Sequence, residues 1–101
     1  MISERQKDVC REAVKHYGRR AQILKVAEEL RELALECVLA ADGQGDPARL
    51  VDERADVAIV LYQLDELLLP RTLEDTLVRV RIGEKIQRLE RRIEDERRHQ
   101  G

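Results

Sequence analysis

The chain has 101 residues, which is enough for one domain over residues 1–101 and no more. Its net charge of −2 excludes a protein that binds nucleic acid polymers through overall positive charge. Charged residues make up 40% of the chain and there is no Phe or Trp, so we expect helices with solvated faces and a core of Leu, Ile, Val and Ala.

The first predicted helix runs from about residue 3 to residue 15. Ser3 and Gln6 have the spacing of a capping box, which satisfies two backbone N–H groups at a helix start. Tyr17-Gly18 is expected to end this helix, because glycine is the usual helix stop.

The second predicted helix covers about residues 20–41. Apolar and small residues recur along it at alternating steps of four and three, which is a heptad-like stripe typical of a packing face. The stripe consists of Ile23, Ala27, Leu30, Ala34, Cys37 and Ala41.

Residues 42–47 form the clearest turn signal, with Asp46 as a helix N-cap and Pro47 at the first helical position. The third predicted helix, over residues 48–68, is apolar around much of its circumference, so it should be the most buried. Because the turn is short, the second and third helices are predicted to pack antiparallel as a hairpin.

A break at residues 69–72 precedes a last predicted helix that continues to about residue 99. Its apolar stripe consists of Ile82, Ile86, Leu89 and Ile93. The expected fold is therefore all-α, with an antiparallel helical hairpin and two flanking helices.

The apolar segments are too short for a membrane protein: the longest uninterrupted run, residues 57–61, is far from spanning a bilayer. The N-terminal residues lack the apolar segment of a signal peptide. A cytoplasmic protein without a membrane partner is expected.

Two pairs of acidic residues fall on neighbouring arms of the predicted hairpin. Glu29 and Glu32 lie three residues apart on one helix, as do Glu53 and Asp56 on the next, so each pair shares a face. In an antiparallel hairpin, residues at one level have position numbers with a constant sum. Glu29 with Asp56 and Glu32 with Glu53 share one such sum, so they are expected to face each other in one square of four carboxylates. The centre of the turn predicts a register four residues away, a difference of about 6 Å along the axis that the tilt of the helices and the geometry of the turn can absorb.

These acids lie beside apolar stripes, on faces that should be buried. Like charges repel strongly there, so a cation is expected among them. All-oxygen ligands without His or Cys select Mg²⁺ or Mn²⁺. The alternative is a solvated acidic patch, since the chain has 21 acidic residues and a single Glu-x-x-Glu pair is common.

The two acidic segments, residues 28–33 and 53–57, resemble the paired Glu-x-x-Glu and Glu-x-x-Asp signature of the MazG-like all-α nucleoside triphosphate pyrophosphohydrolases. The similarity covers roughly residues 13–93. It extends to the short form of the family found in bacteriophages and their hosts through Tyr17-Gly18, Gln22-Ile23, Lys25 and Gln63-Leu64.

The resemblance implies a four-helix-bundle-type homo-oligomer, dimer or tetramer, that hydrolyses a (deoxy)nucleoside triphosphate to the monophosphate and pyrophosphate. It implies that Mg²⁺, with Mn²⁺ as a substitute, is bound by Glu29, Glu32, Glu53 and Asp56. One of these carboxylates would act as general base on the attacking water, and Glu32 is our choice because of its central place.

A triphosphate also needs cations from the protein. Lys85, Arg88 and Arg92 lie at spacings of three and four on one face of the last helix, which makes them candidates for phosphate contacts. The alternative is that they are solvated partners of neighbouring glutamates.

Two further candidates for substrate binding share the arc of the acids on the second helix. Lys25 is expected either to pair with Glu29 or to touch phosphate, and Gln22 either contacts the nucleotide or is merely exposed. Stacking on the base can come only from Tyr17 or Tyr62, because other large aromatic residues are absent.

Two other functions compete with this interpretation. The first is a non-catalytic helical interaction or regulatory module, in which the acids form a solvated patch. The second is a phosphoribosyl-ATP pyrophosphohydrolase of histidine biosynthesis, within the same superfamily.

Overall fold

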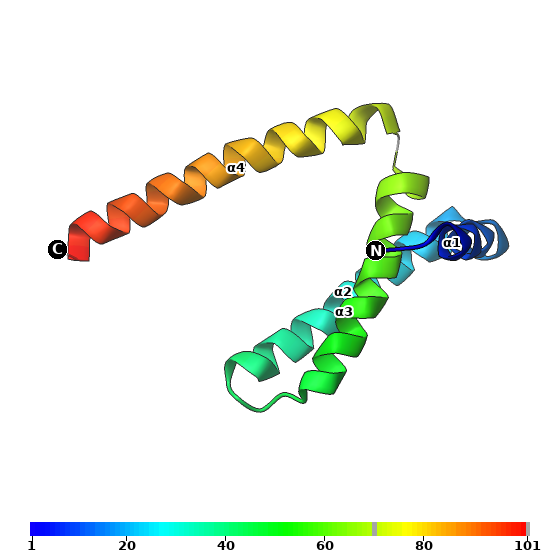
Figure 1. Ribbon diagram of the computed structural model, residues 1–101, viewed down its shortest axis with the longest axis horizontal. Coiled ribbons are helices and arrows are strands. Elements are labelled where there is room, and N and C mark those ends of the chain that lie inside the picture. The colour runs from blue at the N-terminus through cyan, green and yellow to red at the C-terminus, as the bar shows by residue number, and fades with distance from the viewer. Residues whose placement is uncertain (70, 101) are drawn as a thin grey trace. The chain divides into compact units, whose positions relative to one another are not determined.

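A computed structural model describes residues 1–69 and 71–100, without the side chains of residues 71–76. The described chain forms four α-helices and no strand, which confirms the all-α expectation. It divides into two compact units, Met1–Leu69 and Pro70–Gly101, and each is described by itself (Figure 1). That one domain covers residues 1–101 stays a prediction.

Helix α1, Glu4–Tyr17, begins at the predicted capping box. The Ser3 N–H donates to Gln6 Oε1 (2.9 Å), and the Gln6 N–H donates to Ser3 Oγ (3.2 Å). Gly18, with φ +90°, ends this helix and separates it from α2, since few other residues adopt that conformation without strain.

Helix α2, Arg19–Ala41, ends in a Schellman motif at the hairpin turn. The Gly43 N–H donates to the Ala40 carbonyl (3.1 Å), and the Gln44 N–H donates to the Leu39 carbonyl (2.9 Å). Gly43 adopts φ +71°, the left-handed conformation that this motif requires.

Helix α3, Pro47–Gln63, starts as predicted from its sequence. Asp46 Oδ1 accepts a hydrogen bond from the Ala48 N–H (2.9 Å), and Pro47 occupies the first turn. Both ends of the turn are thus closed by local side-chain or backbone hydrogen bonds, which is why the sequence indicated them.

The third helix continues to Leu68, as predicted, but changes its hydrogen bonding. Residues Leu64–Leu68 form a π-helical turn, η1, in which the Leu69 N–H donates to the Leu64 carbonyl (3.0 Å). A periodicity analysis does not separate this wider turn from an α-helix, because both extend the same helical path.

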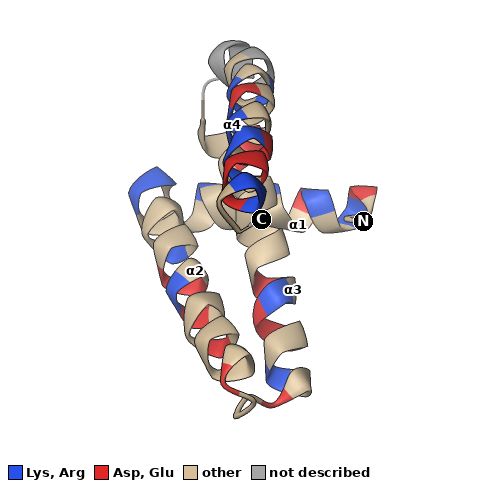
Figure 2. Ribbon diagram, turned by 90° about the vertical axis from the view of Figure 1, so that its left-hand side faces the viewer, with Lys and Arg blue, Asp and Glu red and all other residues tan. Residues whose placement is uncertain are grey.

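The two arms of the hairpin, α2 and α3, lie side by side in both ribbon views and make the most extensive contact in the first unit (Figures 1 and 2). Helix α1 packs on both of them. The buried apolar side chains are small or medium in size, as the composition predicted: Cys10, Val26, Val57, Val60 and Leu68.

The heptad-like stripe of α2 is not the face that packs against α3. Its members from Ala27 to Ala41 are exposed, and Leu30 keeps 42% of its surface accessible. The buried positions of α2 are instead Gln22, Val26, Glu29 and Glu36. The side of α2 that faces α3 therefore carries the polar side chains of Gln22, Glu29 and Glu36, and the apolar stripe is left uncovered within a single chain.

Helix α3 is half covered rather than fully buried. Val57, Val60 and Gln63 are buried, whereas Val51 and Ile59 keep 67% and 46% of their surface accessible. The prediction that this helix is the most buried element holds for one side only, because α2 and α1 together cover only part of its circumference.

The second unit contains α4, Arg71–Gln100. Lys and Arg alternate with Asp and Glu along it (Figure 2), and its predicted apolar stripe, Ile82, Ile86, Leu89 and Ile93, is exposed. Among the described residues, no helix has the length and apolarity needed to cross a membrane.

Candidate metal centre

Three of the four predicted carboxylates come together on the facing sides of α2 and α3. Glu29, Glu53 and Asp56 each offer an oxygen within 4.8 Å of the others. Figure 2 shows the acidic segments of the two helices at the same level of the hairpin. The antiparallel register inferred from the sequence, which sets Glu29 opposite Asp56, agrees with this arrangement.

The three acids differ in burial, and two carry an oxygen without a partner. Glu29 is 5% exposed, Glu53 is half-buried and Asp56 is exposed. Among the described residues, Glu29 Oε2 and Glu53 Oε2 are buried and accept no hydrogen bond. A buried carboxylate oxygen without a partner is costly, so these atoms need a cation or a donor.

Glu32, the fourth predicted ligand, is exposed and lies outside the tight group of three. It is still close to them: the charge of Glu29, then desolvation, then the charge of Glu53 raise the pKa of Glu32. The structure therefore places Glu32 at the border of the acidic group, where its carboxylate reaches water.

Lys25 pairs with the acids on its own helix. Its Nζ lies 3.0 Å from Glu29 Oε1 and 3.6 Å from Glu28 Oε2. The hydrogen bond to Glu29 is the largest cause that raises the pKa of Lys25, followed by the charge of Glu28. Of the two alternatives for Lys25, the ion pair with Glu29 is present, and contact with phosphate stays a prediction.

The arrangement fits a hard divalent cation. Three carboxylate oxygens within 4.8 Å of one another are close enough to share one ion, since oxygens bound to Mg²⁺ at about 2.1 Å are at most about 4.2 Å apart and small side-chain movements close the difference. In a solvated acidic patch the carboxylates would be hydrated, whereas here two carboxylate oxygens are buried and have no hydrogen-bond partner. All donors are carboxylate oxygens, which suits Mg²⁺ or Mn²⁺ and gives no reason to favour a softer metal.

A cavity of about 560 Å³ opens beside the acids. Glu29, Asp56 and Lys25 line part of it, and apolar and amide side chains of the same hairpin line the rest. Gln22, expected either as a nucleotide contact or as merely exposed, is 7% exposed and lines this cavity. A volume of this size is in the range of small-molecule binding sites.

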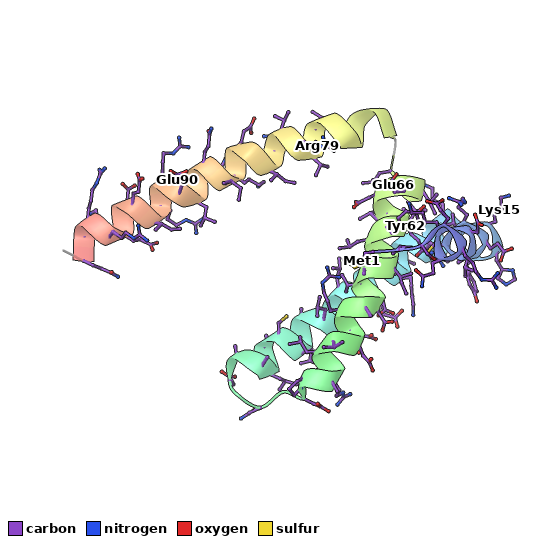
Figure 3. The ribbon with its side chains drawn as sticks, in the orientation of Figure 1. Met1, Lys15, Tyr62, Glu66, Arg79 and Glu90 are labelled. Carbon is purple, nitrogen blue, oxygen red and sulfur yellow. The ribbon has the colours of Figure 1, made fainter. Side chains whose placement is uncertain are left out.

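The two tyrosines take different places. Tyr17 is 64% exposed and lines the cavity. Tyr62 is half-buried beside α1, where Lys7 Nζ lies 5.9 Å from the centre of its ring (Figure 3). Only Tyr17 is therefore placed to contact a molecule in the cavity.

Two polar residues of the hairpin were not predicted as site residues. Gln63 is 3% exposed, lines the cavity and donates from Nε2 to the Cys10 carbonyl (3.3 Å). Glu36 is buried, with Arg49 Nε 3.8 Å from its Oε1. The available signal for Gln63 was its spacing of three from Val60, which puts an amide on a buried arc.

The predicted phosphate contacts Lys85, Arg88 and Arg92 lie in the second unit. All three are exposed and, with Ile82 and neighbouring apolar residues, line a hollow of about 400 Å³ on α4. No ion pair joins them to another described residue, and Glu84, one expected partner, pairs with Arg81 instead (3.2 Å). Their contact with phosphate stays a prediction.

Comparison of the chain with protein-family models, with curated proteins and with solved structures gave no match. The resemblance to the MazG-like enzymes therefore stays a prediction. A function has to follow from the acidic group and the cavity beside it.

Proposed function

We propose that this protein is a Mg²⁺-dependent nucleoside triphosphate pyrophosphohydrolase that acts at the acidic group of the hairpin. One observation carries the proposal. Glu29 and Glu53 each have a buried, unpartnered carboxylate oxygen, and with Asp56 they form a group in which each residue offers an oxygen within 4.8 Å of the others. Two members of this group, Glu29 and Asp56, line a cavity of about 560 Å³.

The chemistry of a triphosphate suits this site. Acids alone would repel it, so Glu29, Glu53 and Asp56 would hold Mg²⁺ between protein and substrate. When bound, this ion neutralises phosphate charge and increases the acidity of coordinated water. Glu32, exposed at the border of the group, would accept a proton from the attacking water. Lys25 fixes the orientation of Glu29 through its ion pair.

The test is Mg²⁺-dependent release of pyrophosphate from the common ribo- and deoxyribonucleoside triphosphates. Phosphoribosyl-ATP belongs in the same panel, because preferential turnover of that compound would assign the enzyme to histidine biosynthesis. No pyrophosphate from any member, with Mg²⁺ or Mn²⁺, would favour the non-catalytic interaction module instead.

We also propose that the active form is a homo-oligomer. The exposed apolar stripe of α2 and the exposed side of α3 are the surfaces that a second copy would cover. Sedimentation equilibrium at micromolar concentration is expected to show at least a dimer of the 11.7 kDa chain. Leu30→Glu should shift the population toward monomer, because it places a charge in the covered stripe.

Lys15→Glu, a charge change on an exposed position of α1, serves as the control for this measurement and should leave the mass unchanged. A stable monomer of the unaltered chain at micromolar concentration would contradict the oligomer.

Lys85→Ala and Arg88→Ala test the predicted phosphate contacts of α4. A cation that acts mainly on the transition state lowers kcat with a modest change in KM, whereas one used for uniform binding raises KM. We expect each variant to change one of these constants by about tenfold, the cost of one charge-assisted contact. Steady-state kinetics are to be compared with Arg81→Ala, whose side chain already pairs with Glu84. Constants within twofold of the unaltered enzyme would exclude the assignment.

A further inference from the structure

Two buried amide side chains line the cavity beside the acidic group. Gln22, on α2, is 7% exposed, and Gln63, at the end of α3, is 3% exposed. Buried amides are almost always hydrogen-bonded, because a dry polar group without a partner is destabilising. The hydrogen bonds that these two side chains make within the chain show which of their donors and acceptors remain available to a ligand.

Gln63 has only part of its amide engaged. Its Nε2 donates to the Cys10 carbonyl of α1 (3.3 Å), and a backbone carbonyl can only accept, so this bond fixes which way the amide faces. Oε1 is thereby held as an acceptor, and one N–H remains. Within the described part of the chain, the Gln22 side chain makes no hydrogen bond to another residue and its amide atoms are not fully enclosed, so its N–H groups and its oxygen are available to a molecule in the cavity.

The rest of the wall suits a flat, apolar ring. Ala21, Ile59 and Val60 supply apolar surface, and Tyr17, largely exposed, supplies an aromatic face. Charged side chains of the cavity belong to the acidic group and its lysine. The cavity thus combines one charged part with a neutral part that offers amide groups and apolar surface.

We propose that Gln22 and Gln63 bind the hydrogen-bonding edge of the substrate's nucleobase, with Tyr17 stacked on its ring, and that they determine base selectivity. An amide pairs with a base edge through one donor and one acceptor, and an aromatic face stacks on any base. The fixed acceptor of Gln63 requires a base that presents an amino or ring N–H there. This inference rests on the proposed function, since a triphosphate held at the acids brings its base to this cavity.

The test measures binding of α,β-imido analogues of dATP, dGTP, dCTP and dTTP in the presence of Mg²⁺, by isothermal titration calorimetry on the full chain. The affinity of the unaltered protein for the best-bound base is expected to exceed that for the worst-bound base by about tenfold or more. The reason is that a mismatched base edge leaves the amide groups unpaired. Gln22→Met keeps the volume and removes the hydrogen bonds, so it should bring the four affinities within about threefold.

Two further variants keep the test decisive. Gln22→Glu retains the shape but replaces donors by acceptors, and is expected to change the order of the bases. Gln63→Met should flatten the preference as Gln22→Met does, with its fold checked by thermal melting because it also loses the bond to Cys10. Gln44→Met, at an exposed position of the hairpin turn, is the matched control and should keep the preference.

The outcomes separate this inference from the proposed function. Glu53→Gln should weaken all four analogues equally and keep their order. If the glutamine variants flatten the preference while Glu53→Gln has no effect, the base site stands and the metal centre fails. Folded Gln22 variants that keep the original order and affinities overturn the inference, as does an unaltered protein that binds all four bases equally. An unaltered protein that binds none overturns both proposals.

Discussion

Glu53→Gln is expected to lower Mg²⁺-dependent pyrophosphate release by at least ~10²-fold, because loss of a metal ligand removes several kcal/mol of charge stabilisation from the transition state. Glu29→Gln and Asp56→Asn should have effects of the same size, since each residue offers an oxygen within 4.8 Å of the other and of Glu53. Glu32→Gln is also expected to lose at least ~10²-fold if Glu32 takes the proton.

The control for these rates is Asp52→Asn. Asp52 is exposed on α3, directly before Glu53, and stands outside the acidic group. It should keep activity within about twofold, since a solvated carboxylate adds little to a site that it does not contact. If Asp52→Asn lost as much activity as Glu53→Gln, overall charge rather than a defined metal centre would explain the effect.

The acidic group also predicts a response of stability to metal. Mg²⁺ should raise the Tm of the unaltered protein, since a ligand that binds only the folded state stabilises it by about 2.7 kcal/mol at 100 times its Kd. Without metal, Glu53→Gln and Glu29→Gln are expected to be as stable as the unaltered chain or more stable. They remove repulsion among acids, one of which is 5% exposed. Thermal melting with and without millimolar Mg²⁺ measures both effects.

In the same experiment, Mg²⁺ should raise the Tm of Glu53→Gln and Glu29→Gln by less than it raises the Tm of the unaltered protein. It should raise the Tm of Asp52→Asn by as much as that of the unaltered protein. A Tm that ignores millimolar Mg²⁺, alone and with a non-hydrolysable nucleotide, would rule out the metal centre. A large loss of stability in metal-free Glu53→Gln would instead mean that this carboxylate holds the hairpin together.

Features set by neighbouring residues could be predicted from the sequence. The capping box of Ser3 and Gln6, and the Asp46 cap, each depend on residues two or three positions apart, and the structure contains them. The short turn predicted the antiparallel hairpin but a register about four residues away from the one that pairs the acids. The approach of Glu29 to Asp56 was predicted from the matching spacing of the two acidic pairs, and the structure contains it.

Features that depend on which faces meet could not be predicted in the same way. Periodicity showed that α2 has an apolar stripe and an acidic arc, but only the packing of α3 shows that the acidic arc is enclosed. The place of Gln63 needed a third element, because its partner is a carbonyl of α1, fifty-three positions away. Asp56 and Glu32 remain exposed because the hairpin alone does not cover that side.

Almost every residue of the turn between α2 and α3 is held by a hydrogen bond that closes one of the two helices. The hydrogen bonds that close α2 involve residues up to Gln44, and the cap of α3 is Asp46, so Gly45 alone lies between them. Gly45 is itself confined, since a Cβ there would meet the Ala40 nitrogen at 3.1 Å. One residue added to a helix advances it by about 1.5 Å and turns it by about 100°. Insertions or deletions here are therefore expected to separate the acids of α2 from those of α3 while leaving every acid in the sequence, whereas substitutions at exposed positions such as Gln44 should leave the acidic group intact.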